Sequence, residues 1–167
     1  MPWKKIYHTG PLGQRDILHY RNAEVVVPQE LDLSALRWIC CRSEAEKDTL
    51  LHLLPPKQRL FYQNKITATT RITLYGRRYT FIQSVRLSSG GAVFYFSPET
   101  LSPGPFRLLV DFRSESGHWQ RRQDDYRVLP QPQLSLRLPG LAQYTTRLTL
   151  DDHLVYENTY EDMDIPF

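Results

Sequence analysis

Residues 79–97 read YTFIQSVRLSSGGAVFYFS, two runs rich in β-branched and aromatic residues on either side of a glycine-containing turn. Alternate side chains of a β-strand point to opposite faces, so the first run has two distinct sides. One side carries Tyr79, Phe81, Gln83, Val85 and Leu87, and the other carries Thr80, Ile82, Ser84 and Arg86. Serine and glycine at 88–91 suit a tight turn. The stretch therefore predicts two short β-strands joined by a turn.

The same period of two continues through most of the chain from about residue 66. Turn residues separate eight short runs, at 66–75, 77–87, 91–97, 106–113, 124–129, 133–138, 144–150 and 153–158. This spacing predicts a mainly β chain, with an antiparallel immunoglobulin-like β-sandwich over residues 62–158. An OB-type barrel of five strands is the alternative, and it would explain nucleic-acid binding directly. The number of strands favours the sandwich.

Residues 1–57 have a different pattern and predict a small α+β lobe before the sandwich. A short strand is expected at Trp38–Cys41, followed by a helix in the stretch SEAEKDTLLHLLPP. Ser43 with Glu46 three positions later forms a capping box at the helix start, and the proline pair at 55–56 ends it. The lobe is too short for a core of its own, so we expect it to pack on the segment that follows.

The charges are distributed unevenly. The formal net charge is +3, but residues 156–167 contain Glu157, Glu161, Asp162 and Asp164 and no Lys or Arg, which amounts to −4. The remaining body therefore carries +3 − (−4) = +7. A basic body with an acidic end suits a protein that works near nucleic acid. An ordinary solvated basic surface is the alternative interpretation.

Basic and aromatic residues alternate within the predicted sandwich, above all in HWQRRQDDYR at 118–127. Such residues could track phosphates and stack bases of single-stranded DNA. The candidate nucleic-acid-binding residues are Arg77, Arg78, Trp119, Arg121, Arg122 and Arg127. In the alternative, the aromatic side chains fill the core and the arginines form the wetted face.

No metal site and no cofactor are expected from the residues themselves. The only cysteines, Cys40 and Cys41, are adjacent and would point to opposite faces of a strand, so a disulfide between them is not expected. No Cys/His spacing resembles a zinc site. No apolar run of membrane-spanning length and no signal-peptide pattern is present, so we expect a cytoplasmic protein without a membrane partner.

The last residues, YEDMDIPF at 160–167, resemble the acidic C-terminal tip of bacterial single-stranded DNA-binding protein (SSB), which ends in Asp-Ile-Pro-Phe. In that family the tip docks onto DNA repair and replication proteins. The resemblance implies a docking tail at 159–167. Its partner-binding residues would be Asp162, Asp164, Ile165, Pro166 and Phe167. Phe167 would enter an apolar pocket while the carboxylates meet a basic surround. The alternative is that Phe167 packs on its own sandwich.

Residues 15–55, including RNAEVVVPQELDLSALRWICCRS, resemble the C-terminal part of DarT-type DNA ADP-ribosyltransferases. In that family a glutamate at the position of Glu24 is catalytic, and the cofactor is NAD. Only 23 residues precede Glu24, too few for the NAD-binding lobe of that family. The leading expectation is therefore a non-enzymatic, DNA-associated interaction protein in which Glu24 is structural. The rival is a partial or split DNA (thymidine) ADP-ribosyltransferase that requires a missing lobe.

Overall fold

The computed structural model describes residues 36–69, 80–98 and 102–162 of the chain. By its internal contacts the chain divides into two compact units, Met1–Leu36 and Arg37–Phe167. Every helix and strand named below belongs to the second unit. The helix that follows Ser43 lies in the same unit as the sandwich.

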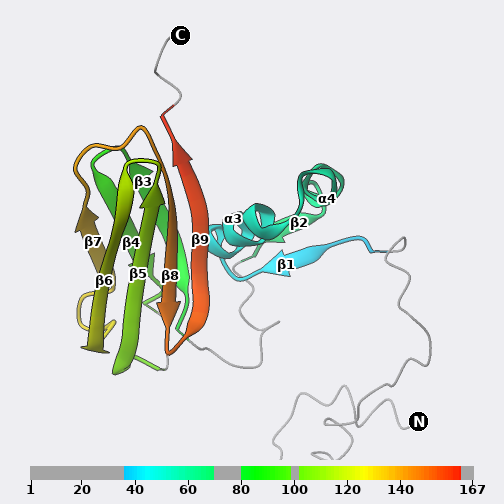
Figure 1. Cartoon of the computed structure of the whole chain (residues 1–167). Helices are drawn as coiled ribbons and strands as arrows, with labels where there is room; N and C mark the ends of the chain where they lie inside the picture. Colours follow the sequence, from blue (N-terminus) through cyan, green and yellow to red (C-terminus); the bar gives the residue numbers. More distant parts are fainter. Residues whose placement is uncertain (1–35, 70–79, 99–101, 163–167) are drawn as a thin grey trace, which may run out of the picture. The chain divides into compact units, whose positions relative to one another are not determined.

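Seven antiparallel strands form two sheets (Figure 1). The three-stranded sheet has the order β3 (Ile82–Ser88), β4 (Gly91–Phe96), β7 (Gln133–Arg137). The four-stranded sheet has the order β6 (Gly117–Tyr126), β5 (Phe106–Ser114), β8 (Gln143–Leu150), β9 (His153–Glu161). Each sheet ends in edge strands rather than closing on itself. The predicted sandwich is therefore confirmed, and the barrel alternative is wrong.

The order of the strands is immunoglobulin-like. The second strand of the sandwich, β4, lies beside the fifth, β7, and the third strand, β5, lies beside the sixth, β8. The chain crosses from one sheet to the other after β4, after β6 and after β7. The proline-rich stretch at 130–132 lies in the second of these crossings, between β6 and β7. The run predicted at 124–129 overlaps only the end of β6, which begins at Gly117 and includes most of the basic and aromatic stretch at 118–127.

The β3–β4 turn lies at the predicted position. The assignment of the β3 side chains to the two faces of the sheet, however, differs from strict alternation. Ser88 pairs with Gly91, which closes the turn. A register shift between Ile82 and Ser84 places one extra residue in β3. Ile82 is therefore buried in the same core that Val85 and Leu87 pack against, although strict alternation assigned it to the opposite face. An extra residue in one strand of a pair has this effect because it shifts the phase of every side chain beyond it.

Aromatic side chains from both sheets fill the core. Phe94 of β4 contacts Tyr156 of β9 edge to face, and Phe112 of β5 contacts Tyr144 of β8 in the same way. Burial of each such side chain stabilises the fold by roughly 1.5–3 kcal/mol. The Tyr144 hydroxyl lies 2.9 Å from the carbonyl oxygens of both Ser88 and Gly91, so this residue links β8 to the β3–β4 turn.

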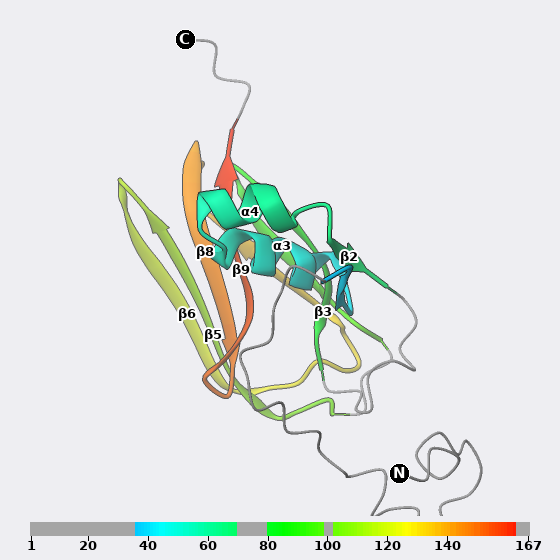
Figure 2. The same ribbon diagram turned by 90° about the vertical axis from the view of Figure 1, so that its right-hand side faces the viewer.

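Helix α3 (Glu44–Leu53) covers the side of the sandwich where the edge strands β3 and β9 meet (Figure 2). The predicted cap is present, since the Ser43 hydroxyl accepts a hydrogen bond from the Glu46 amide. The same hydroxyl donates to the Ile82 carbonyl at 2.6 Å, which ties the helix start to β3. Ala45 completes the contact as part of the core. The expectation that this segment packs on the sandwich is confirmed.

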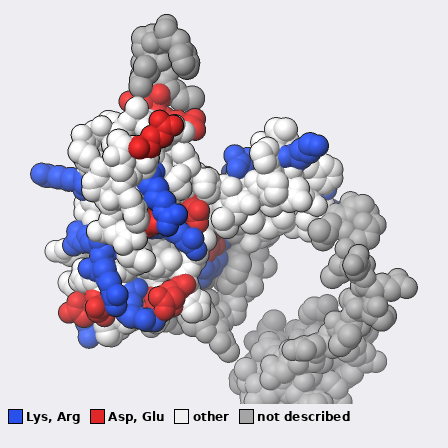
Figure 3. All heavy atoms as spheres, in the orientation of Figure 1, with Lys and Arg blue, Asp and Glu red and all other residues white. Residues whose placement is uncertain are grey.

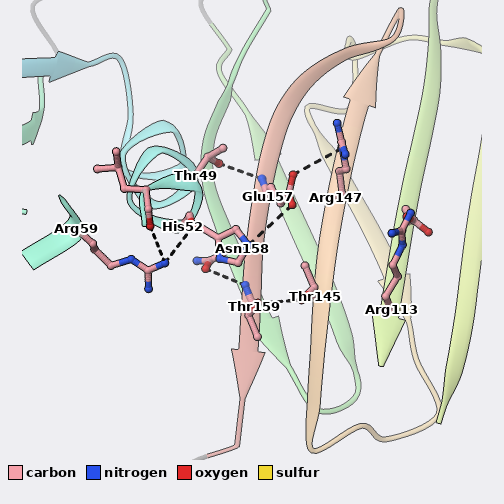
Figure 4. A network of polar contacts seen from close by, with 11 residues as sticks. Thr49, His52, Arg59, Arg113, Thr145, Arg147, Glu157, Asn158 and Thr159 are labelled. Atoms are coloured by element: carbon pink, nitrogen blue, oxygen red, sulfur yellow. Dashed lines mark hydrogen bonds and ion pairs between the residues drawn. The ribbon is translucent and has the colours of Figure 1, made fainter. Parts of the chain in front are cut away.

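Polar contacts fix the middle of α3 on β9 (Figure 4). The Thr49 hydroxyl accepts a hydrogen bond from the backbone amide of Glu157 at 3.1 Å. The Glu157 carboxylate also lies 3.9 Å from His52 on the helix and 3.7 Å from Arg147 on β8. The helix thus supplies a hydrogen-bond acceptor to an edge strand that has no further strand beside it in the described sheet.

Helix α4 (Pro56–Tyr62) was not predicted from the sequence. Neither was the pairing of two short strands, β1 (Ile39–Cys41) and β2 (Ile66–Ala68). These strands are parallel and form a separate sheet. The run expected at 66–75 therefore does not begin as a sandwich strand, and its residues 70–75 lie outside the described part. In the three described segments, no helix combines the length and the apolarity needed to cross a bilayer.

Candidate nucleic-acid interface and C-terminal tip

The candidate residues of strand β6 are divided between its two faces. Trp119 pairs with Phe112 and Arg121 with Val110, so both point to the core side of the sheet, whereas Arg122 belongs to the outer face. Trp119 is half-buried against the core, and its ring lies over Gly117. Trp119 is therefore not an open stacking platform.

On the outer face of the four-stranded sheet, positive charges are matched by negative ones. Four arginines each have a carboxylate partner, in the pairs Arg107–Asp152 at 2.5 Å, Arg113–Asp111 at 2.8 Å, Arg122–Asp124 at 2.9 Å and Arg147–Glu157 at 3.7 Å. The space-filling view accordingly shows blue and red atoms interspersed over the sandwich (Figure 3). This face has little excess charge to attract phosphates.

Asp111 is the most buried of these carboxylates. Burial alone would raise the pKa of Asp111, but hydrogen bonds with His118 and Gln120 and the neighbouring Arg113 outweigh it, so that the pKa lies below its ordinary value. The carboxylate is therefore ionised at neutral pH. Its negative charge offsets the cations around it, which makes this part of the sheet a poor phosphate site.

A groove of about 640 Å³ lies at the opposite side of the sandwich from α3, lined by Arg121, Tyr126 and residues 130–135. Arg127 follows β6 and is exposed. The Tyr126 hydroxyl is buried and has no hydrogen-bond partner in the part of the chain that the structure describes. Burial raises the pKa of Tyr126, against a smaller lowering effect of Arg121. Of the six predicted residues, Arg77 and Arg78 lie outside the described residues. Within the described segments, Arg121 and Arg127 are the only two of the remaining four that are exposed and form no ion pair with a carboxylate.

The six candidate nucleic-acid-binding residues do not reflect another feature of the sequence, which is the complete lack of carboxylates from residue 49 to residue 98. This stretch has no Asp or Glu, and its Lys and Arg residues are Lys57, Arg59, Lys65, Arg71, Arg77, Arg78 and Arg86. It includes α4, β2, β3 and β4. The excess positive charge of the body is therefore concentrated in one stretch of the sequence, and Lys57, Arg59, Lys65 and Arg86 are its cations within the described residues.

The outer face of the three-stranded sheet illustrates this concentration. Arg86 on β3 lies over the ring of Tyr95 on β4, with 5.8 Å between the guanidinium carbon and the ring centroid. Arg137 on β7 pairs in register with Gly91 and is exposed. None of the three strands contains an acidic residue. Cations beside an aromatic ring, without carboxylates, are the chemical elements of a nucleic-acid surface.

The C-terminal tip begins where β9 ends. Glu161 pairs with Gln143, and the backbone amide of Asp162 donates to the Ala142 carbonyl at 2.8 Å. Asp162 is thus anchored at the end of an edge strand, next to the β7–β8 connection. Asp164, Ile165, Pro166 and Phe167 lie outside the described residues, as does Glu24, the candidate catalytic residue.

No group of three or more His, Cys, Asp or Glu side chains that could hold a metal ion is found in residues 36–69, 80–98 and 102–162. Cys40 is exposed and Cys41 is buried, and neither forms a disulfide. Burial raises the pKa of the Cys41 thiol.

Comparisons of the chain with protein-family models, with curated proteins and with solved structures give no match.

Proposed function

We propose that this chain is a non-enzymatic, DNA-associated interaction protein of the cytoplasm. Its basic half contacts single-stranded DNA, and its C-terminal tip docks on DNA repair or replication proteins that also receive the SSB tip. The observation that carries the proposal is the separation of charge. Residues 49–98 contain seven cations and no acid, whereas Glu161, Asp162 and Asp164 lie together in the tip.

The position of the tip supports docking. Tyr160 packs against the described core, and β9 remains paired with β8 as far as Glu161. The Asp-Ile-Pro-Phe sequence follows at 164–167, shortly after this strand. Pro166 restricts the backbone beside it, which lowers the entropy lost when the tip becomes ordered on a partner. Ile165 and Phe167 supply apolar contact area, and the acidic residues favour a basic surround.

Binding of the full chain to a receptor of the SSB tip, such as a RecQ-type helicase, tests this proposal. The comparison is between the unchanged chain, a chain lacking Phe167, and a Leu129→Ala control that removes an exposed apolar side chain elsewhere. We expect loss of receptor binding only when Phe167 is removed, and displacement of the chain by a peptide of residues 158–167. Equal binding by all three chains, or no binding by any, would refute docking through the tip.

One observation favours the split DNA (thymidine) ADP-ribosyltransferase as a second candidate. β1 and β2 form a parallel sheet of only two strands within the described residues, with α3 and α4 between them in the chain. Parallel sheets are usually larger and covered on both faces. A further protein lobe that extends this sheet would fit the rival, with NAD as cofactor and Glu24 as the catalytic residue. NAD-dependent labelling of thymidine-containing single-stranded DNA by this chain, abolished by Glu24→Gln, would establish the second candidate over the first.

A further inference from the structure

The exposed apolar residues of the described chain gather mainly around α4. Of the five large exposed hydrophobic residues, four belong to this region: Trp38 at 65% exposed, Leu53 at 52%, Leu60 at 70% and Phe61 at 60%. Helix α4 buries none of its residues. A cluster of this kind on a soluble surface marks an interaction site more often than a scatter of single residues does.

One helix spacing and two contacts link this cluster to two lysines. Lys57, Leu60 and Phe61 stand at positions i, i+3 and i+4 of α4, which puts them on one side of the helix. The Lys65 ammonium lies 4.7 Å from the centroid of the Phe61 ring. The Lys65 carbonyl accepts a hydrogen bond from the amide of the residue after Trp38, at 2.8 Å. We name Trp38, Lys57, Leu60, Phe61 and Lys65 the α4 patch.

The charge of the α4 patch is uncompensated. It lies at the start of the acid-free stretch, and within the three described segments no carboxylate forms an ion pair with Lys57 or Lys65. In Figure 3 the part of the surface formed by α4 and the adjoining strands shows blue atoms among white ones. Arg59 has another role, since it donates to the carbonyls of His52 and Leu54 at the end of α3 (Figure 4).

We propose that the α4 patch binds single-stranded DNA, with bases stacked on Trp38 and Phe61 and phosphates held by Lys57 and Lys65. This inference rests on the proposed association with single-stranded DNA and names the surface responsible. Both rings are more than half exposed. The Lys65 ammonium lies over the Phe61 ring and Tyr62 contacts the same ring edge to face, so a base would stack on the part of Phe61 that these two residues leave open. A planar base stacks on an open ring, whereas an apolar peptide side chain requires an enclosed pocket. A helix as short as α4 also offers little area for insertion into a membrane surface.

The binding of a fluorescein-labelled oligothymidine of twenty nucleotides to the full chain, followed by anisotropy, tests the proposal. We expect Phe61→Ala and Trp38→Ala each to weaken binding by roughly 5- to 100-fold, and Phe61→Trp to retain it. Lys57→Ala should lower the slope of log K against log salt by about 0.7. All these residues are largely exposed or half-exposed, so circular dichroism and thermal melting should be unchanged. Arg122→Ala and Leu129→Ala are the matched controls on other surfaces, and both should bind as the unchanged chain does.

The outcomes separate this inference from tip docking. Removal of Phe167 should leave oligonucleotide binding intact, so failure of receptor binding alone would affect only the docking proposal. Equal oligonucleotide binding by the patch variants and the controls would overturn the inference, as would absence of binding by the unchanged chain. The Trp38 and Phe61 variants are also tested for binding to a peptide of residues 158–167 and to anionic phosphatidylserine vesicles. If either variant loses binding to the peptide or to the vesicles but keeps its binding to the oligonucleotide, the inference is overturned.

Discussion

Replacement of Tyr144 by phenylalanine tests how the sandwich is joined across its two sheets. The side chain is 1% exposed, and its hydroxyl lies 2.9 Å from the carbonyls of Ser88 and Gly91. Tyr144→Phe keeps the ring contacts with Phe112 and Tyr160 and removes only the hydroxyl. The Gly91 carbonyl keeps a hydrogen bond from the Ser88 hydroxyl at 3.2 Å, so loss of the buried Tyr144 hydroxyl costs about 1–2 kcal/mol. In a chain of this size, that loss lowers Tm by about 2–8 °C.

The pH dependence of this loss makes the prediction sharper. Burial, against the opposing effect of the hydrogen bond to Ser88, raises the pKa of Tyr144 from 10.0 to about 12. The folded state therefore holds this proton more tightly than the unfolded state, and the stabilisation is complete below pH 10 and is lost as the pH rises toward 12. The stability advantage of the unchanged chain over Tyr144→Phe should shrink by about 1.4 kcal/mol for each pH unit in this window.

Urea unfolding at pH 7 and at pH 11, followed by tryptophan fluorescence, measures both effects. The control is Tyr95→Phe, which removes a hydroxyl from the half-buried outer face of β4 and should change the free energy of unfolding by less than about 0.5 kcal/mol. A difference between the unchanged chain and Tyr144→Phe that is absent at pH 7, or that stays constant up to pH 11, would refute the assigned hydrogen bond and its environment.

Gly91→Ala should destabilise the fold by more than about 2 kcal/mol in thermal or urea unfolding, because φ at Gly91 is +150° and a Cβ would lie 2.1 Å from a backbone carbonyl of β7. Gly90→Ala, where a Cβ meets nothing within 4 Å, is its control and should be nearly neutral. Ser43→Ala should cost about 1–2 kcal/mol in the same assay, since it removes the cap of α3 and the hydrogen bond to the Ile82 carbonyl. Asp111→Asn should lower stability at pH 7, and the difference from the unchanged chain should vanish as the pH falls below the ordinary carboxyl pKa of 3.8, because the folded state lowers that pKa.

The parts of the fold that could be predicted are those specified by neighbouring residues. Alternation and turn residues specify the strands of the sandwich and the turn at 88–91, and the capping box specifies the start of α3. The proline pair at 55–56 follows the end of α3 at Leu53, as predicted, but a proline lacks only an amide that the first residue of a helix does not need, so Pro56 also begins α4. The parallel pairing of β1 with β2 depends on residues far apart in the sequence, and no local pattern predicts it.

In the candidate site, too, features specified by neighbouring residues could be predicted and features that depend on strand pairing could not. The interleaved arginines of β6 are visible in the sequence, but their carboxylate partners on the same and adjacent strands depend on register and on side-chain direction. Arg113 stands two positions after Asp111 on β5 and so lies on the same face of the strand. His118 reaches Asp111 because β6 pairs with β5 in this register. By contrast, the lack of carboxylates from residue 49 to residue 98 requires no structure at all, and it could have directed attention to α4 at the outset.

The contact of α3 with β9 has a consequence for how the sandwich can exist as a separate molecule. The helix occupies the side where β3 and β9 would otherwise offer unpaired backbone groups to other chains, and Thr49 satisfies one of the amides there. A fragment that begins at residue 62 would keep all seven strands but lose this cover. Its bare strand edges could pair with the edges of other chains. We therefore expect such a fragment to aggregate more than the chain that retains α3. The smallest fragment of the sandwich expected to resist aggregation therefore includes α3, although this helix contributes no strand to either sheet.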